Sequence, residues 1–229
     1  MHDFFGAESA RAACLPSPER SIQDGWEIFI GRGKDFSYKT VISGKIWKSD
    51  TSERKSLTDL LCKILSEYAG KPDTTLAAGI GNRFITADSL GPLVCSKLLT
   101  GNIGGRKLSA ISPGTPAQTG IDTAVLVSLA AKSQEAQAII TIDSLCASIP
   151  SRLGTVIQIS DRGLIPGSAL THTSSEISRL TMPCKVVSIG VPTVFLSEDM
   201  LMTSAEIDVI CDCLSSVIAS TVNKTIFGR

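Results

Sequence analysis

Histidine is scarce in this chain, and its scarcity excludes several kinds of catalytic site. Only His2 and His172 occur among the 229 residues. A Ser-His-Asp or Cys-His site would have to use His172, which we interpret as a polar loop residue. A histidine-rich zinc site is excluded, and the seven cysteines never show the Cys-x-x-Cys spacing of zinc ligands.

The chain also lacks an excess of charge of either sign. Its 22 basic and 22 acidic residues balance to a net charge of zero. We therefore expect no nucleic acid and no membrane surface as a partner held by bulk electrostatics. No run reaches the roughly 18 apolar residues that span a bilayer, and residues 1–5 do not resemble a secretory signal. The prediction is a cytoplasmic protein with reduced cysteines.

Complete phosphate-binding loops are absent too. The stretch Gly31-Arg32-Gly33-Lys34 is an incomplete P-loop, because Asp35 follows the lysine. The Gly79-Ile80-Gly81 stretch has phenylalanine where a dinucleotide fingerprint has its third glycine. We therefore expect no organic cofactor.

What the sequence does contain is a regular alternation of short apolar runs and amphipathic segments. Strands are predicted at 75–80, 108–111, 138–142, 155–160 and 185–191, and helices at 51–68, 88–99, 121–132 and 203–222. The last helix is expected to open with a capping box of Thr203 and Glu206. This alternation predicts a three-layer α/β fold, with a mainly parallel sheet and helices on both faces.

The N-terminal part differs in character from the rest. Residues 1–25 are expected to form an irregular arm, followed by a strand pair at 26–30 and 39–47. We therefore divide the chain into residues 1–50, an arm with a small β appendage, and residues 51–229, the α/β domain.

Acidic side chains occur at the predicted carboxyl ends of strands, where ligands bind in folds of this kind. Asp143 follows the apolar run 138–142, and Asp88 lies near the predicted start of a helix. Two close carboxylates cannot both ionise easily, so one holds a proton while the other acts as a base on water. Spacing alone, however, favours structural roles for both, as a helix-start acid and a loop cap. Asp122 and Asp161 are rivals by the same positional rule.

Several motifs resemble those of the bacterial spore germination protease, in family order across residues 76–195. They are Gly79-Ile80-Gly81-Asn82, Thr86-Ala87-Asp88-Ser89-Leu90-Gly91-Pro92, Ser109-Ala110-Ile111-Ser112-Pro113-Gly114, Thr119-Gly120-Ile121-Asp122-Thr123, Ile142-Asp143-Ser144-Leu145-Cys146-Ala147, Thr155-Val156-Ile157-Gln158-Ile159-Ser160-Asp161, Pro166-Gly167-Ser168 and Ile189-Gly190-Val191-Pro192-Thr193.

The resemblance implies an atypical aspartic endopeptidase that degrades small acid-soluble spore proteins at germination. It implies the spore core as the location and a homo-oligomer as the assembly. The family's two essential aspartates fall on Asp88 and Asp143. The supporting residues that it implies are Gly81, Asn82, Asp122, Asp161 and Ser168.

Departures from the family pattern keep two other hypotheses open. Ala87 replaces the family's proline, the loop after Gly167 differs, and the N-terminal region matches poorly, so zymogen control is not predicted. One alternative is a catalytically silent spore protein of the same fold. The other is a metal-dependent peptidase similar to hydrogenase maturation endopeptidases. Asp88 and Asp143 would then be metal ligands, while Asp161 stands where that family's histidine ligand is expected.

Overall fold

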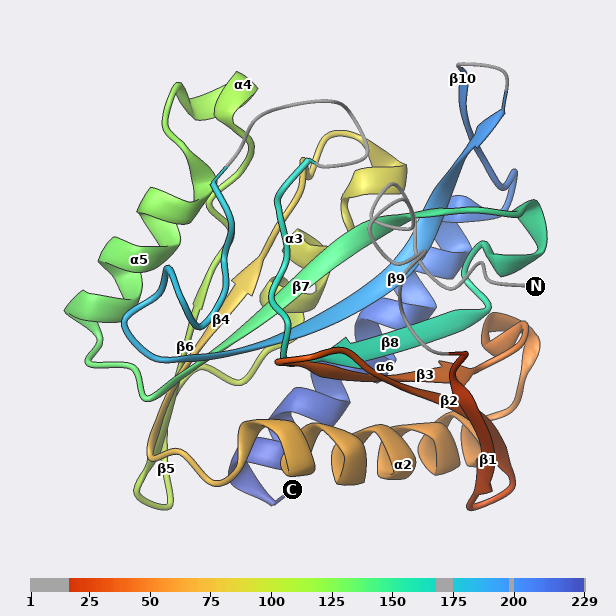
Figure 1. Ribbon diagram of the computed structural model, residues 1–229, viewed down its shortest axis with the longest axis horizontal. Coiled ribbons are helices and arrows are strands. Elements are labelled where there is room, and N and C mark those ends of the chain that lie inside the picture. Colours follow the sequence, from red (N-terminus) through yellow and green to blue (C-terminus); the bar gives the residue numbers. More distant parts are fainter. Residues whose placement is uncertain (1–16, 168–174, 198–199, 229) are drawn as a thin grey trace.

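The computed structural model describes residues 17–167, 175–197 and 200–228, and these build one mixed sheet flanked by helices (Figure 1). The strands are β1 (Glu19–Gln23), β2 (Trp26–Arg32), β3 (Ser37–Ile42), β4 (Thr74–Gly79), β5 (Gly101–Ile103), β6 (Arg106–Ile111), β7 (Ala138–Ala147), β8 (Val156–Ser160), β9 (Lys185–Ser197) and β10 (Met200–Thr203). The helices are α2 (Thr51–Ala69), α3 (Leu90–Lys97), α4 (Pro116–Thr119), α5 (Thr123–Ser133) and α6 (Ile207–Phe227), with short 3-10 turns η1 (Ile46–Lys48), η2 (Thr86–Asp88) and η3 (Pro150–Arg152).

The strand order is β1-β2-β3-β8-β9-β7-β4-β6-β5, and β10 pairs with β9. Pairing is parallel from β9 through β7 and β4 to β6. The outer strands, including β8, are antiparallel to their neighbours. The expected α/β layering is confirmed, and parallel pairing is confined to the four central strands. The N-terminal strands β1 to β3 continue the same sheet through the β3–β8 pair.

Two apolar clusters lie on the two faces of this sheet. The larger one packs α2, α3 and α6 against one face, with Leu57, Leu90 and Leu214 fully buried. The smaller one packs α5 against the other face, through Val127 and Ile139. The sheet therefore has helices on both faces, as the alternation of segments predicts.

Local signals explain where α2 begins and ends. The Asp50 carboxylate caps its first turn by accepting a bond from the Glu53 N–H at 2.9 Å. Gly70 ends the helix with a φ of 76°, a conformation that glycine adopts without steric cost. The prediction of a helix over 51–68 is confirmed.

Two expectations at the chain's ends are wrong. Residues 19–23 form the edge strand β1 rather than an irregular arm. Thr203 does not cap the last helix, because it belongs to β10 and its hydroxyl donates to the Thr193 carbonyl at 2.6 Å. Thr203 therefore belongs to the strand that pairs with β9, and α6 begins only at Ile207.

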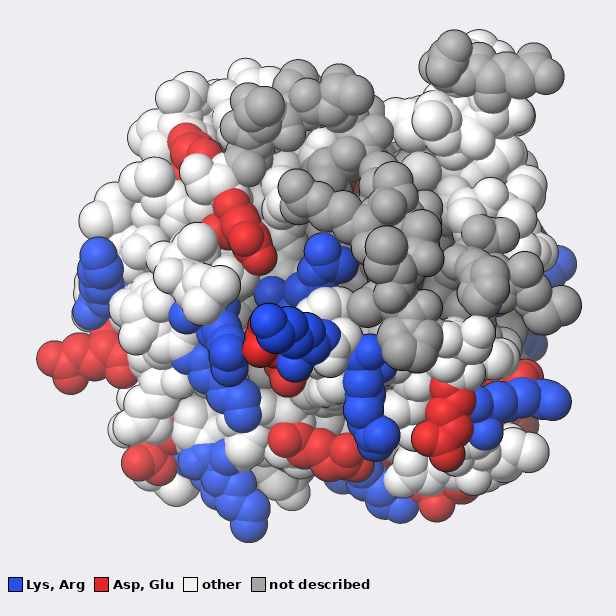
Figure 2. Space-filling view, in the orientation of Figure 1, with Lys and Arg blue, Asp and Glu red and all other residues white. Residues whose placement is uncertain are grey.

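Surface charge is mixed on the face shown in Figure 2, where basic and acidic side chains lie side by side. Within the described ranges, one helix, α6, is long and apolar enough to cross a membrane by length and composition alone. Its side chains at Ile210, Leu214 and Val217 are buried in the larger cluster, as in the core helix of a globular domain.

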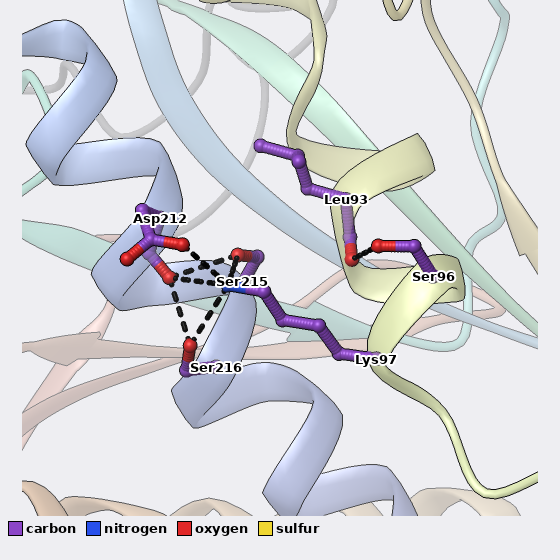
Figure 3. A network of polar contacts seen from close by, with 6 residues as sticks. All are labelled: Leu93, Ser96, Lys97, Asp212, Ser215 and Ser216. Atoms are coloured by element: carbon purple, nitrogen blue, oxygen red, sulfur yellow. Dashed lines mark hydrogen bonds and ion pairs between the residues drawn. The ribbon is translucent and has the colours of Figure 1, made fainter.

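A lysine fastens α3 to α6 (Figure 3). The Lys97 ammonium contacts the Asp212 carboxylate at 2.7 Å and the carbonyl of the same residue at 2.9 Å. It also contacts the hydroxyls of Ser215 at 2.8 Å and Ser216 at 2.9 Å. One side chain at the end of α3 therefore joins four oxygens on two turns of α6.

We expect Lys97→Met to lower the free energy of unfolding by about 1–3 kcal/mol, because several charge-assisted hydrogen bonds are lost together. Urea unfolding measures the change. The matched control is Lys63→Met, which removes a single exposed ion pair to Asp24 and should cost less than about 1 kcal/mol. Equal losses in the two variants would contradict the role given to Lys97.

Candidate active site

The site begins where α3 crosses the carboxyl end of β4 at backbone contact. A Cβ added to Gly79 would lie closer than 3.0 Å to the Gly91 carbonyl. A Cβ added to Gly91 would meet the Ile142 carbonyl oxygen at 2.6 Å, and the backbone of Ile80 is closer still. Any larger residue at either position would push α3 away from the sheet. This contact explains the two glycines and fixes the segment that carries Asp88.

Asp88 lies in η2, just before α3, and its carboxylate turns back toward the end of β4. The Asn82 N–H donates to its Oδ2 at 2.7 Å. Gly81 has a φ of 118°, and a Cβ there would lie 2.8 Å from Asp88 Oδ1. The turn from Gly81 to Asn82 therefore contacts one side of this carboxylate, and there is no room for a side chain at position 81.

Burial sets the protonation of Asp88. Desolvation raises the pKa of its carboxyl from 3.8 to about 6, although the Asn82 N–H pulls the pKa down again in part. A carboxyl with this pKa exchanges protons readily near neutral pH, which is the property of a general acid or base.

Asp143 lies inside β7 rather than after its end. The expected strand 138–142 continues to Ala147, since β9 pairs with it along its whole length. Asp143 pairs with Gly190, is only 8% exposed, and accepts a bond from the Ser144 N–H at 2.8 Å. A carboxylate at this depth needs polar partners to stay charged.

Both carboxylates lie at the same edge of the sheet. The last pair between β4 and β7 is Gly79 with Ile142, so Asp143 stands one residue beyond the end of β4. Asp88 is bonded to Asn82, three residues beyond Gly79. The end of β4 is therefore bordered by both acidic residues.

The two acids approach this edge from different faces. Ile139 packs in the α5 cluster, whereas Ile140 and Ile142 pack in the cluster of α2, α3 and α6. Because strand residues alternate between faces, Asp143 lies on the α5 face with Ile139. Asp88 belongs to η2, which contacts α6 and β7 on the other face.

Polar groups around Asp143 were not singled out by the sequence pattern. Below it on the α5 face, the Thr141 hydroxyl bonds the Ser188 hydroxyl at 2.8 Å. On the other face, the buried Ser144 hydroxyl has no hydrogen-bond partner among the residues that the structure describes. Polar residues at 141, 143 and 144 in an otherwise apolar strand are the signal that could have indicated them.

The other expected site residues lie in different places. Asp122 caps α5, accepting from the Ala124 N–H at 2.8 Å and the Ser175 N–H at 3.0 Å. Asn82 joins the site to α4, because its Oδ1 accepts a bond from Gln118 Nε2 at 2.8 Å. Ser168 and His172 fall outside the described residues.

Asp161 is not brought to this edge. β8 runs antiparallel to β9, so its end points away from Asp143, and the expectation that Asp161 follows a parallel strand is wrong. Its carboxylate accepts from the Ser37 N–H at 2.7 Å. It lines a cavity of about 380 Å³ with Lys39 and Lys185.

A metal site would need a further ligand beside the two candidate carboxylates. Within residues 17–167, 175–197 and 200–228, no group of three or more His, Cys, Asp or Glu side chains is arranged to hold a metal ion. The donor set of Asp88 and Asp143 alone does not match the two carboxylates and one histidine expected of a maturation peptidase.

We expect the Asp88 carboxyl to titrate near pH 6 in the folded protein, which carboxyl-carbon NMR measures directly. Since the folded state holds this proton between pH 3.8 and about 6 while the unfolded state releases it, this group makes stability fall as pH rises through that window. Urea unfolding of Asp88→Asn should show that this part of the pH dependence is gone. A midpoint near pH 4 would contradict the burial argument.

Comparison with known proteins supplies the family. The germination protease family model matches residues 22–197. Curated relatives named germination protease are 31% identical over 203 residues in Oceanobacillus iheyensis (82% of this chain, 54% of the relative) and 38% identical over 174 residues in Bacillus pumilus (69% and 47%). A third, from Geobacillus sp. (strain WCH70), is 34% identical over 197 residues (79% and 52%).

The chain thus spans about half the length of the curated relatives that it matches. Among solved structures, the [NiFe] hydrogenase maturation protease HycI from Thermococcus kodakarensis KOD1 aligns with a TM-score of 0.46 and 16% identity, covering 69% of this chain and 98% of that chain. The match of the family model over most of the sequence decides the assignment: this chain belongs to the germination protease family.

Proposed function

We propose that this protein is an endopeptidase that hydrolyses peptide bonds of small acid-soluble spore proteins, using Asp88 and Asp143 to activate water. The observation that carries the proposal is the pair of acids bordering the end of β4, one of them with a pKa raised to about 6. Family membership supports the peptidase class. The spore core as location and a homo-oligomer as assembly rest on the family resemblance alone.

The proposed chemistry uses the approach of the acids from opposite faces. A peptide bond held across the end of β4 would have one carboxyl group on either side. Asp143 takes a proton from a water molecule while the oxygen of that water bonds to the carbonyl carbon of the substrate. Asp88 then donates its proton to the departing amide nitrogen as the C–N bond breaks. The raised pKa of Asp88 supports its role as the proton donor. No organic cofactor enters the scheme.

Asp88→Asn and Asp143→Asn test this assignment one acid at a time. Each should lower the rate of cleavage of a purified small acid-soluble spore protein by at least about 100-fold, since a positioned acid or base contributes that much. Mass spectrometry of the peptide products measures the rate, and thermal melting shows that each variant is folded. For the unaltered protein, kcat/KM should fall above about pH 6, as Asp88 loses its proton.

The matched control is Asp24→Asn, in the turn beside the outer strand β1. Asp24 has a φ of 53°, a conformation that asparagine also adopts, so the variant should fold and cleave normally. Full activity of either active-site variant would refute the mechanism. No cleavage by the unaltered protein, with or without divalent metal, would favour a catalytically silent family member. Metal in the purified protein and loss of activity with a chelator would favour a metal-dependent peptidase.

A further inference from the structure

The segment just before Asp88 exposes two large apolar side chains. Phe84 is 80% exposed and Ile85 is 54% exposed. Single exposed apolar residues are common on protein surfaces. Two consecutive ones beside a candidate catalytic carboxyl are a more specific feature, because the site must hold a protein chain there.

The segment is held in place by its own hydrogen bonds. The Asn82 side chain accepts from the Phe84 N–H at 3.0 Å and from Gln118 Nε2 at 2.8 Å. The Asn82 carbonyl accepts from the Ile85 N–H at 3.0 Å. The Arg83 guanidinium lies 5.6 Å from the centre of the Phe84 ring, a cation–π distance that orients the ring. The apolar side chains are therefore presented by an ordered turn.

A second turn connects this surface to the candidate acid. The Asp88 N–H donates to the Ile85 carbonyl at 2.8 Å. Such a bond brings the Cα atoms of residues 85 and 88 within about 7 Å of each other. An extended peptide rises about 3.3 Å per residue. A substrate side chain resting on Ile85 would thus lie about two or three residues from a bond held at Asp88.

We propose that Phe84 and Ile85 form a recognition surface that receives an apolar side chain of the protein substrate, within about three residues of the cleaved bond. The inference rests on the proposed function and adds to it what the enzyme recognises. Removal of apolar surface from water drives this contact, and the pre-ordered turn keeps the entropy cost of binding low. Continuity with the Asp88 turn favours substrate as the occupant over a second copy of the chain.

Phe84→Ser tests the surface without touching the acids. Its side chain is largely exposed, so the variant should fold, and we expect KM for the spore protein to rise about tenfold or more with kcat little changed. The matched control is Ile22→Ser on β1, at the far edge of the sheet, where the side chain is 72% exposed. This control should leave KM unchanged.

Binding is measured separately from cleavage, so that failure of the proposed function can be told apart from failure of this inference. A fluorescently labelled small acid-soluble spore protein is titrated into Asp143→Asn protein, alone and combined with Phe84→Ser or Ile22→Ser. Weaker binding only with Phe84→Ser supports the surface, even if no variant cleaves.

Other outcomes overturn the inference. They are an unchanged affinity with Phe84→Ser, an equal loss with Ile22→Ser, no binding by Asp143→Asn protein, or a changed oligomeric state with Phe84→Ser. A loss of affinity with Val125→Ser, on the exposed face of α5, but not with Phe84→Ser would move the substrate surface to that helix.

Discussion

The site depends on one contact between backbones, the crossing of α3 over the end of β4 and the middle of β7. Gly79 and Gly91 face each other with no room for a Cβ, and the space at Gly91 is bounded by the carbonyl oxygens of Ile80, just after β4, and Ile142, within β7. Carbonyl groups of a paired strand cannot move aside as a flexible side chain can. The position of η2, and with it the depth of the Asp88 carboxyl, follows from this crossing.

Helix α6 supports the same crossing from outside the sheet. Near its start, the Cys211 thiol lies 3.5 Å from the Thr86 carbonyl in η2. Burial raises the pKa of that thiol to about 11, so it stays protonated and acts as a small, uncharged packing group. The next residue, Asp212, and Ser215 one turn later bind the Lys97 ammonium at the end of α3. A single buried helix therefore holds both ends of the segment that includes Asp88.

The sequence predicted the layered architecture because apolar periodicity separates strands from helices well. It could not predict strand direction, since an apolar run such as 156–160 reads the same in a parallel or an antiparallel neighbourhood. Because β8 is antiparallel to β9, the prediction that Asp161 lies at the same sheet edge as Asp143 is wrong. For Asp88 and Asp143, position after a strand predicted the edge of the sheet. It did not predict that Asp143 is buried within β7, because this depends on how far β9 continues alongside β7. It did not predict the opposite faces of the two acids either, because the face of Asp88 depends on the packing of η2 against α6.

The antiparallel insertion of β8 also governs the order in which the chain can fold. The Ser37 N–H bonds the Asp161 carboxylate across 124 positions in sequence, and β3, which pairs with β2 on one side, gains its second partner strand only when β8 exists. Closing so long a loop carries an entropy cost, and chains rich in distant contacts fold slowly. During synthesis, the hairpin of β2 and β3 can form early, whereas the β3–β8 pair must wait for the 124 positions that separate Ser37 from Asp161. Strand β8 in turn reaches the central strands only through β9, so the N-terminal strands can join the central sheet only after β9 has been made.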